Sequence, residues 1–246
     1  MADADDEAVA LPASVELAWG RRGPAMKGPK RALTLDQVVA AGVAVAASEG
    51  LASLSMAKVA ARLGVGTMSL YRYVESKDEL LTVMVDTALG PPPARPARER
   101  GWRAGLTRWA TGVRAAYRAN PWSMRVPISG PPLGPNNVAW LEDALQSMAD
   151  TPLSDAQKLS TVMLLAGFVR AEAMLTTDVE AAIEAGLAMP GYGAMLGRLV
   201  DDRFPAIQAA IASGSLDDDD DIDKEFEFGL ARILDGIAAL ITEVGA

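Results

Sequence analysis

The segment that decides the fold is residues 54–77, which read LSMAKVAARLGVGTMSLYRYVESK. The pattern predicts two short helices joined by a glycine turn. Ser55 can cap the first helix, and Gly64 lies where a helix ends in a left-handed conformation that glycine adopts without strain. The first helix carries an apolar face at helical spacing, made of Met56, Val59, Ala60 and Leu63.

The second helix of this pair is very short and has a distinctive outer face. Leu70 and Val74 are expected to point back into the core. The residues left on or near the outside are Thr67, Met68, Ser69, Tyr71, Arg72 and Tyr73. A short helix with a polar, aromatic and cationic outer face, held rigidly against a partner, is typical of a helix-turn-helix that enters the DNA major groove.

Two further helices are predicted to flank this pair. Thr34 and Gln37 form a capping box at the start of a helix that ends at Glu49-Gly50. Ser76 and Glu79 form a second capping box, and the helix that they begin stops at Gly90, where three prolines follow. We therefore divide the chain into a segment 1–32, disordered and first acidic then basic, a headpiece 33–90, and a larger helical domain 91–246, for which dimerisation and effector binding are argued below.

The composition of the 246 residues favours an all-α protein, since half are apolar and few alternate at period two. Cysteine and histidine are absent, which excludes disulfides, thiolate nucleophiles, zinc fingers and histidine triads; no cofactor or metal is expected. The acidic start predicts no signal peptide, and we find no long uncharged apolar run of the kind that spans a membrane. A cytoplasmic protein is expected.

The net charge of −9 is unevenly distributed. Residues 21–80 hold nine basic and five acidic side chains, a local charge of +4, which is what a phosphate backbone within a Debye length of about 10 Å would meet. The basic run Arg21–Arg31 is either an arm that reaches DNA or a solvated linker. The acidic run Asp217–Asp221 faces the start of a helix or is a solvated loop, with a calcium site as a weak alternative.

Two helices in the C-terminal half are apolar on more than one side or along their whole length. Residues 154–175 carry two apolar stripes, and residues 226–244 carry one continuous stripe. Two such helices from each of two subunits would make a four-helix interface; the alternative is that both complete the core of one chain. The predicted interface residues are Leu164, Leu165, Leu175, Phe226, Leu230, Ile233, Leu234, Ile237 and Ile241.

This arrangement resembles the TetR family of transcriptional regulators. The resemblance is carried by residues 60–64, by VGTMSLYRYV at 65–74 and by SKDEL at 76–80, and less strongly by the C-terminal part. It implies that Thr67, Met68, Ser69 and Arg72 face base edges or adjacent phosphates, that Tyr71, Tyr73 and Lys77 hold the DNA backbone, and that Ser55 is a further contact. Ala57 stands where tetracycline repressors have an arginine, so their operator cannot be transferred.

The resemblance also implies that a small molecule binds among the middle helices. The candidate lining residues are Trp102, Trp109, Val113, Trp140, Ala144, Met163 and Phe168, which suit an apolar, aromatic ligand. The alternative is that these side chains form ordinary core. Tetracycline with magnesium is disfavoured, because that site uses histidine.

We therefore predict a ligand-responsive regulator, most simply a repressor, that binds a palindromic operator in double-stranded DNA as a homodimer and is released by a small apolar or aromatic effector. The alternatives are a helical small-molecule-binding protein without DNA binding, and an activator of the same family. An enzyme is not expected, because Glu172 and Asp178 are the only inward-leaning acids and their spacing suggests no chemistry.

Overall fold

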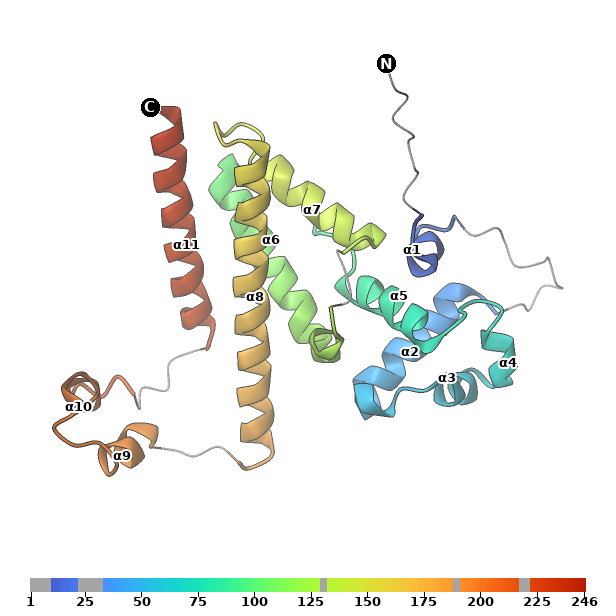
Figure 1. Cartoon of the computed structure of the whole chain (residues 1–246), viewed down its shortest axis with the longest axis horizontal. Helices are drawn as coiled ribbons and strands as arrows, with labels where there is room; N and C mark the ends of the chain where they lie inside the picture. The colour runs from blue at the N-terminus through green and yellow to red at the C-terminus, as the bar shows by residue number, and fades with distance from the viewer. Residues whose placement is uncertain (1–9, 22–32, 129–131, 188–190, 217–221) are drawn as a thin grey trace, which may run out of the picture. The chain divides into compact units, whose positions relative to one another are not determined.

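The computed structural model describes residues 10–21, 33–128, 132–187, 191–216 and 222–246. Within these ranges the regular structure is entirely helical (Figure 1), which confirms the all-α prediction. By packing, the chain divides into two units, one up to Ala166 and one from Gly167 onward. The basic run from Arg22 and the acidic run 217–221 lie outside the described residues. The predicted boundary at residue 90, between the headpiece and the C-terminal domain, differs from this division by packing and stays a prediction.

The headpiece consists of α2 (Leu35–Glu49), the 3-10 turn η1 (Leu51–Ser53), α3 (Met56–Leu63), α4 (Thr67–Leu70) and α5 (Lys77–Leu89). The capping box of α2 is confirmed: Gln37 N donates to Thr34 Oγ1 at 3.2 Å, and Thr34 N donates to Gln37 Oε1 at 2.9 Å. Local sequence signals therefore set where these helices begin.

The start of α5 differs in one detail from the prediction. Ser76 Oγ accepts from Glu79 N at 3.1 Å, as expected of a cap. The carboxylate of Glu79, however, accepts from Glu75 N at 2.5 Å and so reaches one residue further back than in a reciprocal capping box. The predicted second capping box is therefore confirmed for the Ser76 hydroxyl and wrong for the Glu79 carboxylate, which accepts from Glu75 N instead of Ser76 N.

The headpiece core joins α2, α3, α4 and α5. Its fully buried side chains include Val38, Val59, Leu70, Val74, Leu80 and Met84. Helices α2 and α5 approach closely at Gly42, where an added Cβ would lie 2.6 Å from Met84 Sδ. The small residue is required at this crossing, because a larger one would displace a core methionine.

An additional helix lies in the segment that was expected to be disordered. Helix α1 (Ala13–Ala18) contacts α5, and Val15 and Leu17 are buried. Trp19 Nε1 also donates to Leu133 O at 2.7 Å. The disorder prediction is therefore wrong for residues 13–18, because an apolar pair in a short segment gains a partner surface on α5 that the local sequence does not show.

The rest of the first unit is built on α6 (Gly101–Ala119), the 3-10 turn η2 (Pro121–Arg125) and α7 (Pro135–Ser147). Helix α6 packs on α7, and α5 contacts both, so the headpiece and the following helices are joined through α5. The rings of Trp109 and Trp140 meet edge to face with centroids 6.1 Å apart.

Helix α8 (Asp155–Glu184) continues from the first unit into the second, which also contains α9 (Tyr192–Gly197), α10 (Pro205–Ala212) and α11 (Ile222–Gly245). Phe168 stacks on Phe226 with centroids 5.8 Å apart. Gly229 permits this contact, because an added Cβ would lie 2.6 Å from the ring of Phe168.

In the described part of the chain, α8 is one helix whose length and composition would allow it to cross a membrane. One third of its most apolar 18-residue window is buried. This is a weak indication of a membrane span, since core helices of soluble proteins can have the same length and composition.

Candidate nucleic-acid interface

The turn between α3 and α4 fixes the direction of the short helix. Gly64 has φ 67° and ψ 31°, the left-handed conformation predicted for it. Gly64 N donates to Ala61 O at 3.1 Å and Val65 N to Ala60 O at 3.0 Å, which satisfies the last carbonyls of α3. Helix α4 then starts at Thr67 after the extended Gly66.

The outward face of α4 and the turn that follows it are accessible. Met68 is 78% exposed and Tyr71 43%, and Arg72 and Lys77 are exposed as well. Leu70 and Val74 are fully buried, as the sequence predicted. Thr67 and Ser69, which were expected on or near the outside, are half-buried. The arrangement presents a thioether, a phenol and two cations on one short, well-anchored segment.

Two of the candidate residues also have structural roles. Tyr73 is half-buried and packs against the headpiece core. The hydroxyl of Ser55 accepts from Lys58 N at 3.3 Å and caps α3. Lys58 itself is paired with Glu49 at 2.5 Å.

A buried carboxylate on α5 caps the start of α7. The side chain of Asp86 is 4% exposed and accepts from the backbone N of Asn136 (3.1 Å) and of Asn137 (2.9 Å). It also accepts from both side-chain amides, at 3.2 Å from Asn136 Nδ2 and 2.7 Å from Asn137 Nδ2. Gly134 is required here, because an added Cβ would overlap the carboxylate of Asp86.

The sequence analysis does not predict this contact between Asp86 and α7, although the sequence holds a signal for it. The N-cap of α7 is Gly134, which has no side chain to accept hydrogen bonds from the free N–H groups of the first turn. An acceptor had to come from elsewhere in the chain. The carboxylate of Asp86 supplies it and favourably meets the positive end of the α7 dipole.

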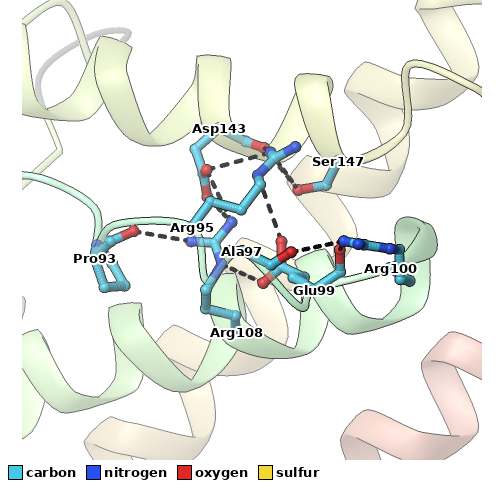
Figure 2. Close-up of polar contacts among 8 residues, drawn as sticks. All are labelled: Pro93, Arg95, Ala97, Glu99, Arg100, Arg108, Asp143 and Ser147. Carbon is cyan, nitrogen blue, oxygen red and sulfur yellow. Dashed lines mark hydrogen bonds and ion pairs between the residues drawn. The ribbon is translucent and has the colours of Figure 1, made fainter.

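A second polar cluster ties the connector after α5 to α6 and α7 (Figure 2). Arg108 Nε donates to Glu99 Oε2 at 2.7 Å, and its NH2 group lies 2.8 Å from Asp143 Oδ2. Arg95 forms ion pairs with the same two carboxylates, at 3.4 Å from Glu99 and 3.5 Å from Asp143. Burial alone would lower the pKa of Arg108, but the hydrogen bonds to Glu99 and Asp143 outweigh it and raise that pKa.

The candidate ligand-lining residues differ in their burial. Trp109, Val113, Trp140 and Ala144 are buried on α6 and α7, and Trp102 is half-buried. Both buried indoles are hydrogen-bonded, Trp109 Nε1 to Trp140 O and Trp140 Nε1 to Gly90 O, each at 2.8 Å. These two tryptophans therefore pack as core.

The last two lining candidates, Met163 and Phe168, belong to α8. Met163 is 72% exposed on α8, so its side chain is not enclosed within a single chain. Phe168 is half-buried against Phe226. Helical spacing showed that these residues share faces, but not which face turns inward.

The predicted dimer-interface residues separate into two groups. Leu164 and Leu175 are exposed by 55% and 68%, as an interface requires. Ile233 and Ile241 are half-buried. The other predicted interface residues are buried within the chain: Leu165, Phe226, Leu230, Leu234 and Ile237. Their burial favours the alternative that the sequence left open, in which such a stripe completes the core of one chain.

Comparison with known families covers both halves of the chain. Residues 38–84 match the family described as "Bacterial regulatory proteins, tetR family". Residues 95–241 match "Tetracyclin repressor-like, C-terminal domain". Residues 85–94, which contain the end of α5 and the proline-rich connector, separate the two matches.

Individual relatives agree with these matches. The HTH-type transcriptional repressor DrrR1 of Streptomyces coeruleorubidus is 38% identical over 238 residues, 94% of this chain and 86% of DrrR1. The structure of apo ActR from Streptomyces coelicolor aligns with a TM-score of 0.73 and 29% identity over 86% of this chain and 98% of ActR. ActR in complex with actinorhodin aligns with a TM-score of 0.72 and 29% identity, over 85% of this chain and 97% of ActR.

Proposed function

The chain belongs to the TetR family and is a transcriptional regulator, not an enzyme, and from this premise we propose that it binds a palindromic operator as a homodimer and is released by a small apolar or aromatic effector. Its site of action is then the cytoplasm. The observation that carries the proposal is the exposed face of α4 and its following turn, with Met68, Tyr71 and Arg72 outward on a helix-turn-helix whose core is fully buried.

The proposed roles follow from the chemistry of the side chains. Arg72 and the α4 residues Thr67, Met68 and Ser69 lie toward the base edges, and the guanidinium suits a guanine. Tyr71, Tyr73 and Lys77 hold phosphates, and Ser55 adds a contact at the start of α3. Lys77 is exposed at the first position of α5, where free N–H groups also favour an anion.

A second copy of the chain is proposed to dock on the outer face of α8. We define this face by the exposed residues Met163, Leu164, Gly167, Ala171 and Leu175. The buried residues Val162, Leu165, Val169 and Ala173 lie on the opposite side of the same helix. Gly167 and Ala171 are small, so two copies of α8 can cross closely there.

The effector proposal rests on the C-terminal family match and on the complex of ActR with actinorhodin. Coupling to DNA would pass through α5, which contacts α2 in the headpiece and α6 and α7 beyond it. The Asp86 junction holds α5 to the first turn of α7. An effector that moves α7 would therefore shift α5 and with it α4, and effector and operator must weaken each other equally.

The experiment that tests this function is selection of duplex DNA from a random library, followed by gel-shift titration of the selected sites. We expect pseudo-palindromes whose half-sites are centred about 34 Å apart, one helical turn. A chain that enriches no sequence, and binds no duplex at low salt, would be a helical ligand-binding protein instead.

Removing phosphate contacts should weaken all DNA sequences alike. We expect Lys77→Ala to lower affinity for selected and unrelated duplexes by a similar factor and to reduce the slope of log K against log salt by about 1 for each phosphate that is no longer neutralised. Arg98→Ala, an exposed cation outside the headpiece, is the matched control. Unchanged operator binding by the double variant Tyr71→Ala/Lys77→Ala would refute the assignment of the interface.

A charge on the α8 outer face should disrupt the dimer. We expect Leu175→Asp to convert the chain to a monomer at micromolar concentration, because each copy would bury an unpaired carboxylate at the interface. Sedimentation equilibrium measures the change. Ile128→Asp, at another apolar residue that is 76% exposed, should leave the mass unchanged. A dimer that tolerates Leu175→Asp would exclude this face.

A further inference from the structure

Met68 is an exception in a headpiece that buries its large apolar side chains. Between residues 33 and 90, which are described without a gap, Met68 (78%) and Tyr71 (43%) are the large hydrophobic residues that are exposed. Leu70 and Val74, close by in sequence, are fully buried. Met68 therefore contributes nothing to the core of the headpiece, and its apolar surface is free to meet a partner.

The position of Met68 places it among the DNA-facing residues of the proposed function. It is the second residue of α4, and the exposed Arg72 lies in the turn that directly follows this helix. The neighbouring Thr67 is half-buried, so its methyl group is less accessible than the Met68 side chain. Met68 is thus the most exposed apolar group on this face.

The major groove offers one apolar partner to such a group. Every base pair presents hydrogen-bond donors and acceptors there, whereas only thymine adds a C5-methyl group. The methionine thioether makes no strong hydrogen bond, and its unbranched chain adapts its shape to the surface that it meets. Against any other base pair edge, Met68 would cover polar atoms without replacing their hydrogen bonds to water.

We propose that Met68 is a specificity-determining residue that selects a thymine in each operator half-site through contact between its side chain and the thymine C5-methyl group. The proposal rests on the proposed function and deepens it. Burying one methyl group corresponds to about a fourfold change in affinity, and two symmetric contacts in a dimer to about fifteenfold.

The test uses the full-length chain and a site selected from a random duplex library. Each thymine is replaced in turn by deoxyuridine, which removes the C5-methyl group and leaves the base-pairing edge unchanged. For the wild-type chain we expect one thymine per half-site at which the replacement weakens binding about fourfold, and about fifteenfold when both half-sites are changed. Met68→Ala should bind thymine and deoxyuridine equally at this position, and Met68→Leu should keep most of the preference.

Thr67→Ser is the matched control, because it removes the only other methyl group of α4 near the bases. Loss of the thymine preference in Thr67→Ser, with the preference intact in Met68→Ala, would assign the contact to Thr67 and overturn the proposal. A wild-type chain that binds the site but is insensitive to deoxyuridine would also overturn it, with the proposed function intact. A chain that binds no duplex at all would overturn both. Circular dichroism of each variant verifies folding.

Discussion

Replacing Arg108 with methionine is expected to lower the free energy of unfolding by about 3 kcal/mol, because it leaves two largely buried carboxylates without their main cation. Glu99 and Asp143 have side chains that are 8% and 14% exposed, and Arg108 holds both (Figure 2). Arg95 remains beside them at 3.4 and 3.5 Å, which keeps the expected destabilisation at the lower end for a broken buried pair.

Thermal unfolding at fixed protein concentration measures this destabilisation. A change of about 3 kcal/mol corresponds to a fall in Tm of roughly 6–12 °C for a chain of this size. Arg98→Met, at an exposed arginine of the same connector, is the control and should change Tm little. Adding Glu99→Gln to Arg108→Met should restore part of the stability, since it removes one of the unpaired charges. Equal Tm values for the two arginine variants would show that the cluster is not stabilising.

Replacing Asp86 with alanine is expected to cost a similar amount, about 3 kcal/mol. The substitution removes the acceptor for two backbone N–H groups and two side-chain amides at the start of α7. Hydrogen bonds to a charged group contribute about 1.5–3 kcal/mol each, but water can reach part of the freed first turn, so the sum is smaller than four full bonds. Asp86→Asn should also be destabilising, because the NH2 group of the new side chain would face the N–H donors of Asn136 and Asn137.

Asp78→Asn is the matched control for this position. Asp78 lies in the first turn of the same helix α5 but is exposed, so the change should cost a few tenths of a kcal/mol through the helix dipole. The Asp86 variant should also respond less to an effector, at a temperature at which it is still folded, since α5 and α7 would no longer move together. If Asp86→Ala is as stable as Asp78→Asn, the junction does not hold the helices together.

The recognition element was predictable because its signals are local. The Ser55 cap, the left-handed Gly64 and the inward Leu70 and Val74 all depend on residues within a few positions of each other. The same is true of the capping box at Thr34. Wherever a hydrogen bond or a turn closes within one helical turn, the residue type alone selects the geometry.

The amphipathic faces were predictable only in part. The sequence showed that α8 has two apolar stripes, but a helical period does not say which stripe meets the rest of its own chain. Leu165 turned out to be buried and Met163 exposed. On α11, Phe226 and Leu230 are buried, although they share the periodicity typical of an interface helix.

By itself, then, the sequence determined the helix-turn-helix, most of its exposed outer face and the all-α class of this regulator, because caps, glycine turns and helical periods act between near neighbours. Only the tertiary structure decided that α1 folds onto α5, that Arg108 joins Glu99 to Asp143, and that Asp86 caps a helix 50 residues away. Those contacts depend on which surfaces meet after the chain has folded. The residues next to Asp86 in sequence therefore do not indicate that its carboxylate caps a helix far along the chain.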